Sequence, residues 1–110
     1  MAIPETDLDR IRLWCRERWP EDMWHQAKVE ADVADRHVDI VEVRPAWDGV
    51  GEPIRESVAR LRYTASTGQW AIYWCDSDLR FHEYKHKRPS KNVQTLLDHI
   101  ENSGDPIFWG

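Results

Sequence analysis

The sequence predicts an α+β fold: an N-terminal helix, an antiparallel meander of four to five strands forming a roll or half-barrel, a C-terminal helix and a short extended apolar tail. Apolar residues recur at helical spacing near each end of the chain, and they alternate with polar residues between about 26 and 84. Short polar or glycine-containing turns separate the alternating segments. Since 110 residues is a usual size for one domain, we expect a single domain over 1–110.

The first helix is expected over residues 7–19, where four apolar residues recur at helical spacing: Leu8, Ile11, Cys15 and Trp19. Thr6, followed three residues later by Asp9, resembles an acidic capping box. Pro20 disfavours helical dihedral angles at the preceding residue, so the helix should end there.

The next segments change to a period of two, which predicts three strands. The first begins at Gln26 and runs to residue 33, and a tight turn leads to a second over 38–41. The third is expected over 58–65. Residues 44–57 contain two prolines and two glycines and should form the longest loop, which makes them a place to look for function.

A fourth strand over 70–75 carries apolar residues on both faces, so we expect it to be the central strand. Polar residues 76–78 should turn the chain into a fifth strand over 79–84. Ser90 is expected to cap a second helix, which ends at Asn102 and Gly104. Its apolar stripe consists of Val93, Leu96, Leu97 and Ile100.

The chain closes on Ile107, Phe108 and Trp109, where polar residues are usual. An apolar tail of this kind should dock. Docking on the protein's own sheet is favoured over a homodimer through the same three residues, because intrachain contacts carry no association cost.

Charge and composition restrict the class of protein. A formal net charge of −5 argues against a protein that coats nucleic acid non-specifically, since such binding neutralises phosphates. The two cysteines lie far apart in a chain for which no secretory leader is expected, so they do not indicate a disulfide framework. No apolar run reaches the roughly 18 residues of a membrane span. We therefore expect a cytoplasmic protein with no membrane segment, and nothing in the sequence indicates a cofactor.

Aromatic residues interleave with arginines and a histidine on neighbouring predicted strands, an arrangement that can stack and clamp a nucleotide or single-stranded nucleic acid. The set comprises Trp47, Trp70, Trp74, Phe81 and Tyr84 with Arg60, Arg62, Arg80 and His82. Core packing of the aromatics, with arginine stems covering their edges, explains the same pattern and is the stronger interpretation. Nucleic acid is therefore a partner that the sequence allows but does not favour.

Two polar sets carry further alternatives. Asp76, Glu83 and Lys85 match the loose Asp, Glu-x-Lys pattern of metal-dependent nucleases, in which carboxylates hold the cation. Such triplets arise freely in a chain that is 32% charged, so no metal site is predicted. In the long loop, Arg44, Asp48 and Glu52 form either a ligand-binding cluster or, as we favour, turn residues and a surface ion pair.

Several motifs are specific in combination. They are residues 58–63 (VARLRY), Tyr73 with Trp74, Asp76, residues 79–84 (LRFHEY), Val93 with Leu96 and Leu97, and residues 105–110 (DPIFWG). These motifs resemble the bacterial DUF3024 family, a domain of unknown function, and the similarity reaches back through Trp14 and Cys15 to His25 and Gln26. No activity, cofactor or catalytic residue is established for that family, so the resemblance implies no reaction. Relatives tend to carry basic residues at Cys75 and Glu83, and the departure at Glu83 weakens the nuclease pattern.

The polar residues that match the family pattern are Arg60, Arg62, Asp76, Arg80 and His82. The resemblance implies that a function shared by the family would reside there. Adding Trp47 and Trp74, we predict a small binding or regulatory module whose sheet face takes an anionic ligand or peptide, because arginines beside aromatics suit planar anions. The alternative is a small metal-dependent hydrolase or nuclease using Asp76, Glu83, Lys85 and His82.

Overall fold

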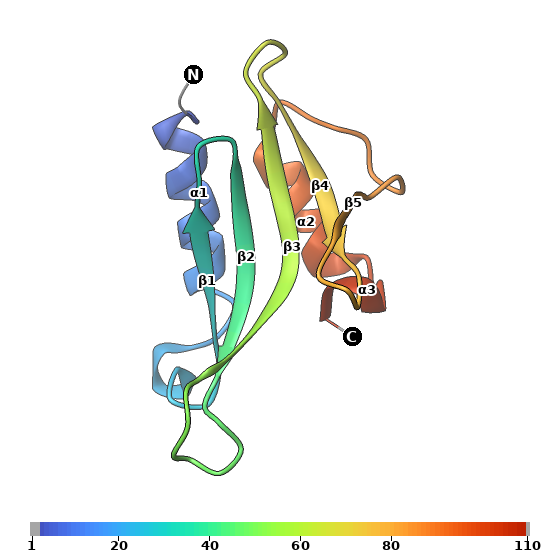
Figure 1. Cartoon of the computed structure of the whole chain (residues 1–110). Coiled ribbons are helices and arrows are strands. Elements are labelled where there is room, and N and C mark those ends of the chain that lie inside the picture. The colour runs from blue at the N-terminus through green and yellow to red at the C-terminus, as the bar shows by residue number, and fades with distance from the viewer. Residues whose placement is uncertain (1–2, 110) are drawn as a thin grey trace.

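Five antiparallel strands form one open sheet in the order β1-β2-β3-β4-β5, and helices cover one of its faces (Figure 1). The strands are β1 (Lys28–Val33), β2 (His37–Arg44), β3 (Ile54–Thr64), β4 (Gln69–Cys75) and β5 (Phe81–Glu83). The computed structural model describes residues 3–109 and, for Trp109, only the backbone. The predicted α+β class and antiparallel meander are confirmed, and the sheet does not close into a barrel.

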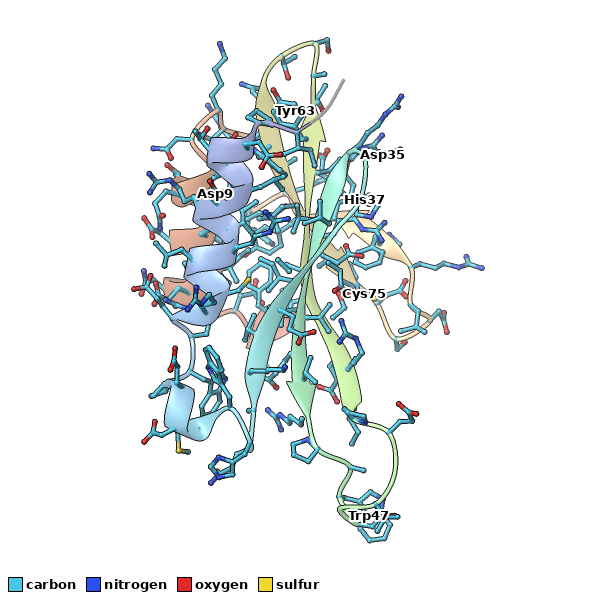
Figure 2. All side chains as sticks on the ribbon, turned by 90° about the vertical axis from the view of Figure 1, so that its left-hand side faces the viewer. Asp9, Asp35, His37, Trp47, Tyr63 and Cys75 are labelled. Carbon is cyan, nitrogen blue, oxygen red and sulfur yellow. The ribbon has the colours of Figure 1, made fainter. Side chains whose placement is uncertain are left out.

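The helical segments are α1 (Glu5–Arg16), the short 3-10 helix η1 (Glu21–Met23), α2 (Val93–Asn102) and α3 (Pro106–Trp109). Helices α1 and α2 lie on the same face of the sheet (Figure 2). No helix in the part of the chain that the structure describes is long and apolar enough to cross a membrane.

The core lies between the helices and the sheet face that they cover. Alternate residues of four strands contribute to it, as the periodicity predicts: Val29, Ala31, Val38, Ile40, Ala59, Leu61, Trp70 and Ile72. The helices contribute their apolar stripes, including Ile11, Leu96, Leu97 and Ile100. Because side chains alternate along a strand, the residues between these positions must lie on the opposite, uncovered face.

Helix α1 begins and ends earlier than predicted. The carbonyl of Pro4 already accepts hydrogen bonds from the amides of Asp7 and Leu8, both at 3.1 Å, so helical bonding starts before Thr6. No side chain caps this end, and the predicted capping box is therefore wrong. Trp19 lies beyond the end of the helix and packs against the core from the following segment.

Strand pairing extends into the predicted long loop. Arg44 pairs with Ile54, so β2 and β3 form a longer hairpin and only residues 45–53 remain as loop. Residues 52–56 include charged side chains, and the register shifts at Ile40 and Val41. This part of the strand therefore shows no simple alternation in the sequence. The central strand is β3, not β4. Strand β4 also carries the aromatic residue Tyr73 on its uncovered face, where the Arg62 guanidinium lies 5.9 Å from the centre of the ring.

The turn before β5 and the cap of α2 also differ from the prediction. Leu79 adopts a left-handed φ of 63° and is 80% exposed, so the fifth strand starts at Phe81. The cap of α2 is Asn92, whose side-chain oxygen accepts from the Gln94 amide at 3.1 Å. Ser90 instead forms a bridge with Trp70.

The C-terminal tail is helical, where an extended segment was expected. The Ile107 amide donates to a carboxylate oxygen of Asp105 at 3.1 Å, so an aspartate immediately before the segment supports the first turn of α3. Phe108 is 5% exposed and belongs to the core cluster. The predicted docking of the tail on its own chain is confirmed.

Candidate functional site

The structure distributes the predicted site residues over three separate places. Arg60 and Arg62 lie on the uncovered sheet face, and Asp76, His82 and Trp74 lie where β4 meets β5. Trp47 stands at the tip of the 45–53 loop, at the opposite end of the molecule from Tyr63 (Figure 2). The predicted set is thus not one site.

Register brings a group of arginines and rings together on the uncovered face. Strand β3 places Arg60 opposite Tyr73 of β4, and it places Arg62 opposite His37 of β2. Figure 2 shows His37 and Cys75 on the face away from the helices. We call this surface the arginine-aromatic face; it comprises Arg36, His37, Arg60, Arg62, Tyr73 and Phe81, which line a hollow of about 280 Å³.

Arg60 has a structural role in this face. Its guanidinium donates two hydrogen bonds to the Asp39 carboxylate, at 2.7 and 3.1 Å, and it stacks 3.8 Å from the centre of the Phe81 ring. The hydrogen bonds to Asp39 raise the pKa of Arg60. The charge of Arg60 is therefore already paired within the chain, and one face of the Phe81 ring is already covered.

Arg36 and Arg62 differ from Arg60 in their partners. Within the described residues, neither guanidinium forms an ion pair with a carboxylate, and Arg62 lies 5.9 Å from the centre of the Tyr73 ring. Both arginines also line an adjoining hollow of about 230 Å³ at the β3–β4 hairpin, with Tyr63, Thr64, Ala65 and Ser66. Two arginines without an ion-pair partner in the described chain thus line both hollows.

Three residues of this face escaped the sequence prediction: Arg36, His37 and Tyr73. Arg36 occupies the β1–β2 turn, and its backbone carbonyl accepts from the Tyr63 amide at 2.7 Å, which places the turn beside β3. Such a neighbour follows from the pairing of β2 with β3. An antiparallel pairing of the second and third predicted strands would have placed position 37 next to position 62. The sequence therefore held a signal for His37.

Asp76 and His82 form a second, smaller cluster. The Asp76 Oδ2 and His82 Nε2 atoms lie 2.6 Å apart, and the His82 ring lies 4.8 Å from that of Trp74. The other oxygen of Asp76 accepts from the amides of Asp78 and Arg80, at 2.8 and 3.0 Å. The pKa of Asp76 is lowered, chiefly by His82 and then by these amides. The side chain of Arg80 is exposed in the turn.

The nuclease pattern is not brought together around this pair. Glu83 follows His82 in β5 and so points to the other face of the sheet. No group of three or more His, Cys, Asp or Glu residues within the described chain is placed to hold a metal ion. The nuclease pattern therefore adds no third metal ligand to the Asp76–His82 pair.

The Asp76 carboxylate should hold the β4–β5 turn. Asp76→Ala is expected to lower the midpoint of thermal unfolding by a few degrees at pH 7, because two amides and His82 lose their partner. Since the pKa of Asp76 is lowered in the folded chain, this stabilisation is present above pH 3.8 and is lost as the pH falls below it. Thermal melts from pH 7 to 3 measure the effect. Asp78→Ala is the control; equal losses in the two variants would refute the role.

The 45–53 loop is a structured turn. Asp48 accepts from the amides of Val50 and Gly51, at 3.0 and 3.3 Å, which chiefly lower its pKa. Arg44 pairs with Glu42 of its own strand. Within the described residues, no ion pair links Arg44, Asp48 and Glu52, so the expected surface ion pair is not formed, whereas Asp48 does hold a turn.

Two motifs that carry the family resemblance meet in the structure. The Tyr84 hydroxyl donates to Asp105 at 2.9 Å, and His99 Nε2 lies 3.1 Å from the same hydroxyl oxygen. Burial and then the Asp105 hydrogen bond raise the pKa of Tyr84 to about 12. The ring of Phe108 lies 4.9 Å from that of Tyr84, so Phe108 is engaged within its own chain. The side chain of Trp109, the third residue of the proposed dimer contact, lies outside the described residues.

An open antiparallel sheet with helices on one face and an arginine-aromatic cluster on the other defines a small α+β domain. The chain belongs to the family described as Domain of unknown function (DUF3024), whose model matches residues 2–110. The resemblance seen in the sequence motifs is thus confirmed over essentially the whole chain. No curated protein and no solved structure gives a significant match, so function has to be argued from the site itself.

Proposed function

We propose that this protein is a small binding or regulatory module that takes an anionic ligand on the arginine-aromatic face. The observation that carries the proposal is that Arg36 and Arg62 line a hollow without a carboxylate partner in the described chain. The protein as a whole has a formal net charge of −5, so this concentration of positive charge is local. Local positive charge attracts anions even to an acidic protein.

The contacts around the hollow support specific recognition of an anionic ligand in addition to electrostatic attraction. Asp39 fixes Arg60 by two hydrogen bonds, and Arg60 covers Phe81, so this part of the hollow is already ordered before a ligand arrives. An ordered site loses less conformational entropy on binding. Arginine remains charged at any physiological pH and presents a planar fork that matches carboxylates and phosphates.

We place this module in the bacterial cytoplasm. Cys15 and Cys75 are both free thiols, which suits a reducing compartment. Burial raises the pKa of Cys15 to about 12, so this thiol is unreactive at neutral pH.

The alternative is a small metal-dependent hydrolase or nuclease, and one observation supports it: the 2.6 Å contact between Asp76 and His82. A carboxylate that orients an imidazole is a usual part of a general base. Hydrolysis of a nucleotide or oligonucleotide that stops on addition of a chelator, and that Asp76→Asn abolishes, would favour this alternative over the binding module.

Titration with inorganic pyrophosphate tests the binding proposal. We expect saturable amide shifts in proton-nitrogen NMR spectra at residues 36–37 and 60–64. Arg36→Ala and Arg62→Ala should each weaken binding about fivefold or more, because each removes one charged donor. Arg12→Ala on α1 is the matched control, since it removes the same charge from the helical side of the molecule and should change Kd less than twofold. Absent shifts, or equal weakening by all three variants, would contradict the proposal.

A further inference from the structure

The two adjoining hollows differ in their lining. The larger one is lined by the rings of Tyr73, Phe81 and His37, whereas the smaller one is lined by Tyr63 and the hairpin residues Thr64, Ala65 and Ser66. Arg36 and Arg62 line both. A single ligand that fills both hollows therefore needs a flat apolar part, an anionic part and a connection passing the two arginines.

Tyr73 offers a stacking surface that Phe81 does not. Arg60 already covers Phe81 at 3.8 Å and is held there by Asp39. The guanidinium of Arg62 is 5.9 Å from the Tyr73 ring centre and forms no ion pair in the described chain. Carbon atoms in contact lie about 3.5–4.0 Å apart, so a flat ring between Tyr73 and Arg62 needs roughly 7–8 Å. A shift of the flexible Arg62 side chain by about 1–2 Å provides that space.

The smaller hollow suits a phosphate. Arg36 and Arg62 supply the charge, and the hairpin residues Thr64 and Ser66 carry hydroxyl donors. Arginine binds phosphate through two parallel hydrogen bonds, which fixes orientation as well as affinity. The edge of the Arg62 guanidinium can donate to the phosphate while its plane covers the stacked ring, because the two interactions use different parts of the group.

The edges of the face limit the length of the ligand. On β1, Glu30 and Asp32 lie on the same sheet face and pair with Arg55, which already neutralises that arginine. On β5, Glu83 lies opposite Tyr73. A polyanion that extended across the strands in either direction would meet carboxylates, and like charges repel. Across the strands, Arg62 on β3 therefore lies between two edges that carry carboxylates.

We infer that the ligand is a nucleoside phosphate, with its base between Tyr73 and Arg62 and its phosphate against Arg36, Arg62 and the β3–β4 hairpin. This inference rests on the proposed anion-binding function and names the chemical class of its ligand. The base contributes stacking and the phosphate contributes charge, so the two parts can be measured separately.

Calorimetric titration with adenosine diphosphate, pyrophosphate and adenosine tests the inference on the full chain. The diphosphate should bind about tenfold more tightly than pyrophosphate, because only the diphosphate carries a base that can stack on the aromatic ring. Tyr73→Leu should remove this difference, because it weakens binding of the diphosphate more than binding of pyrophosphate. Tyr73→Phe keeps the ring and should retain the difference.

The outcomes distinguish the two proposals. Equal affinity for the diphosphate and pyrophosphate would overturn the nucleoside inference and leave the anion site in place, whereas failure of both to bind would overturn both. Loss of the difference in Tyr73→Phe as well as in Tyr73→Leu would refute ring stacking. Binding of a single-stranded oligonucleotide tighter than that of the diphosphate by tenfold or more would identify a nucleic-acid surface instead, and would also refute the inference.

Discussion

Replacing Trp70 with alanine is expected to lower the free energy of unfolding by about 3–5 kcal/mol, the usual cost of removing a fully buried large aromatic side chain. Trp70 is 0% exposed, and its ring lies 5.1 Å from that of Tyr63. Its indole Nε1 donates to the carboxylate of Asp7 at 2.9 Å, which ties β4 to the first turn of α1. Denaturation in urea, followed by far-ultraviolet circular dichroism, measures the change.

Trp47→Ala provides the matched control, because it makes the same substitution at a side chain that is 92% exposed. Its free energy of unfolding should stay within about 0.5 kcal/mol of the parent protein. If Trp70→Ala fails to fold, Trp70→Phe, which keeps most of the ring and loses the hydrogen bond to Asp7, should show a smaller but measurable loss. A cost at position 70 no larger than that at position 47 would refute the central place of Trp70 in the core.

Tyr84→Phe is the second large effect that we expect, at about 1.5–3 kcal/mol near pH 7, because hydrogen bonds to charged groups are stronger than neutral ones. The Tyr84 hydroxyl is the contact that joins Asp105, at the start of α3, to the segment after β5, and the residue is 4% exposed. The substitution keeps the ring that packs on Phe108. The effect can therefore be assigned to the hydroxyl.

The pH dependence of this variant gives an independent test. Folding raises the pKa of Tyr84 from 10.0 to about 12, so between these values the unfolded chain loses the proton more readily than the folded one. The stabilisation is fully present below pH 10.0 and is lost as the pH rises to about 12. Unfolding curves between pH 8 and 12 should show a steeper alkaline loss in the parent than in Tyr84→Phe. Tyr73→Phe, on the uncovered face, is the control; if it removed the alkaline loss equally, the assignment to Tyr84 would be wrong.

Local patterns in the sequence predicted most of the secondary structure, and they failed where tertiary contacts decide. The alternation of apolar and polar residues predicted the strand β1, because a strand with one buried face must alternate. The apolar stripe of α2 predicted the helix and its buried side in the same way. Ser90 was a plausible helix cap by residue type, yet its backbone pairs with Trp70, so the cap is Asn92. Leu79 looked like a strand residue, although the turn held by Asp76 places it in solvent.

The candidate site shows the same division. Arg60 and Arg62 were predicted because they interleave with aromatic residues on neighbouring strands and match the family pattern. Their partners Arg36 and Tyr73 come from the β1–β2 turn and from β4, and only the register of the sheet places them alongside. Asp76 and His82 were predicted together with these arginines, but they belong to a separate cluster at the β4–β5 turn.

The sequence by itself determined the α+β class, the helical stripes, the alternation of the strands and membership of the family. The helical stripes and the strand alternation depend on residues close together in the chain, whose spacing repeats with the geometry of a helix or a strand. Only the tertiary structure decided that β3 is central, that the tail forms α3, and that Arg36 and Arg62 remain without a carboxylate partner in the described chain beside Tyr73. Strand pairing sets those neighbours, and a pairing between distant segments leaves no period in the sequence.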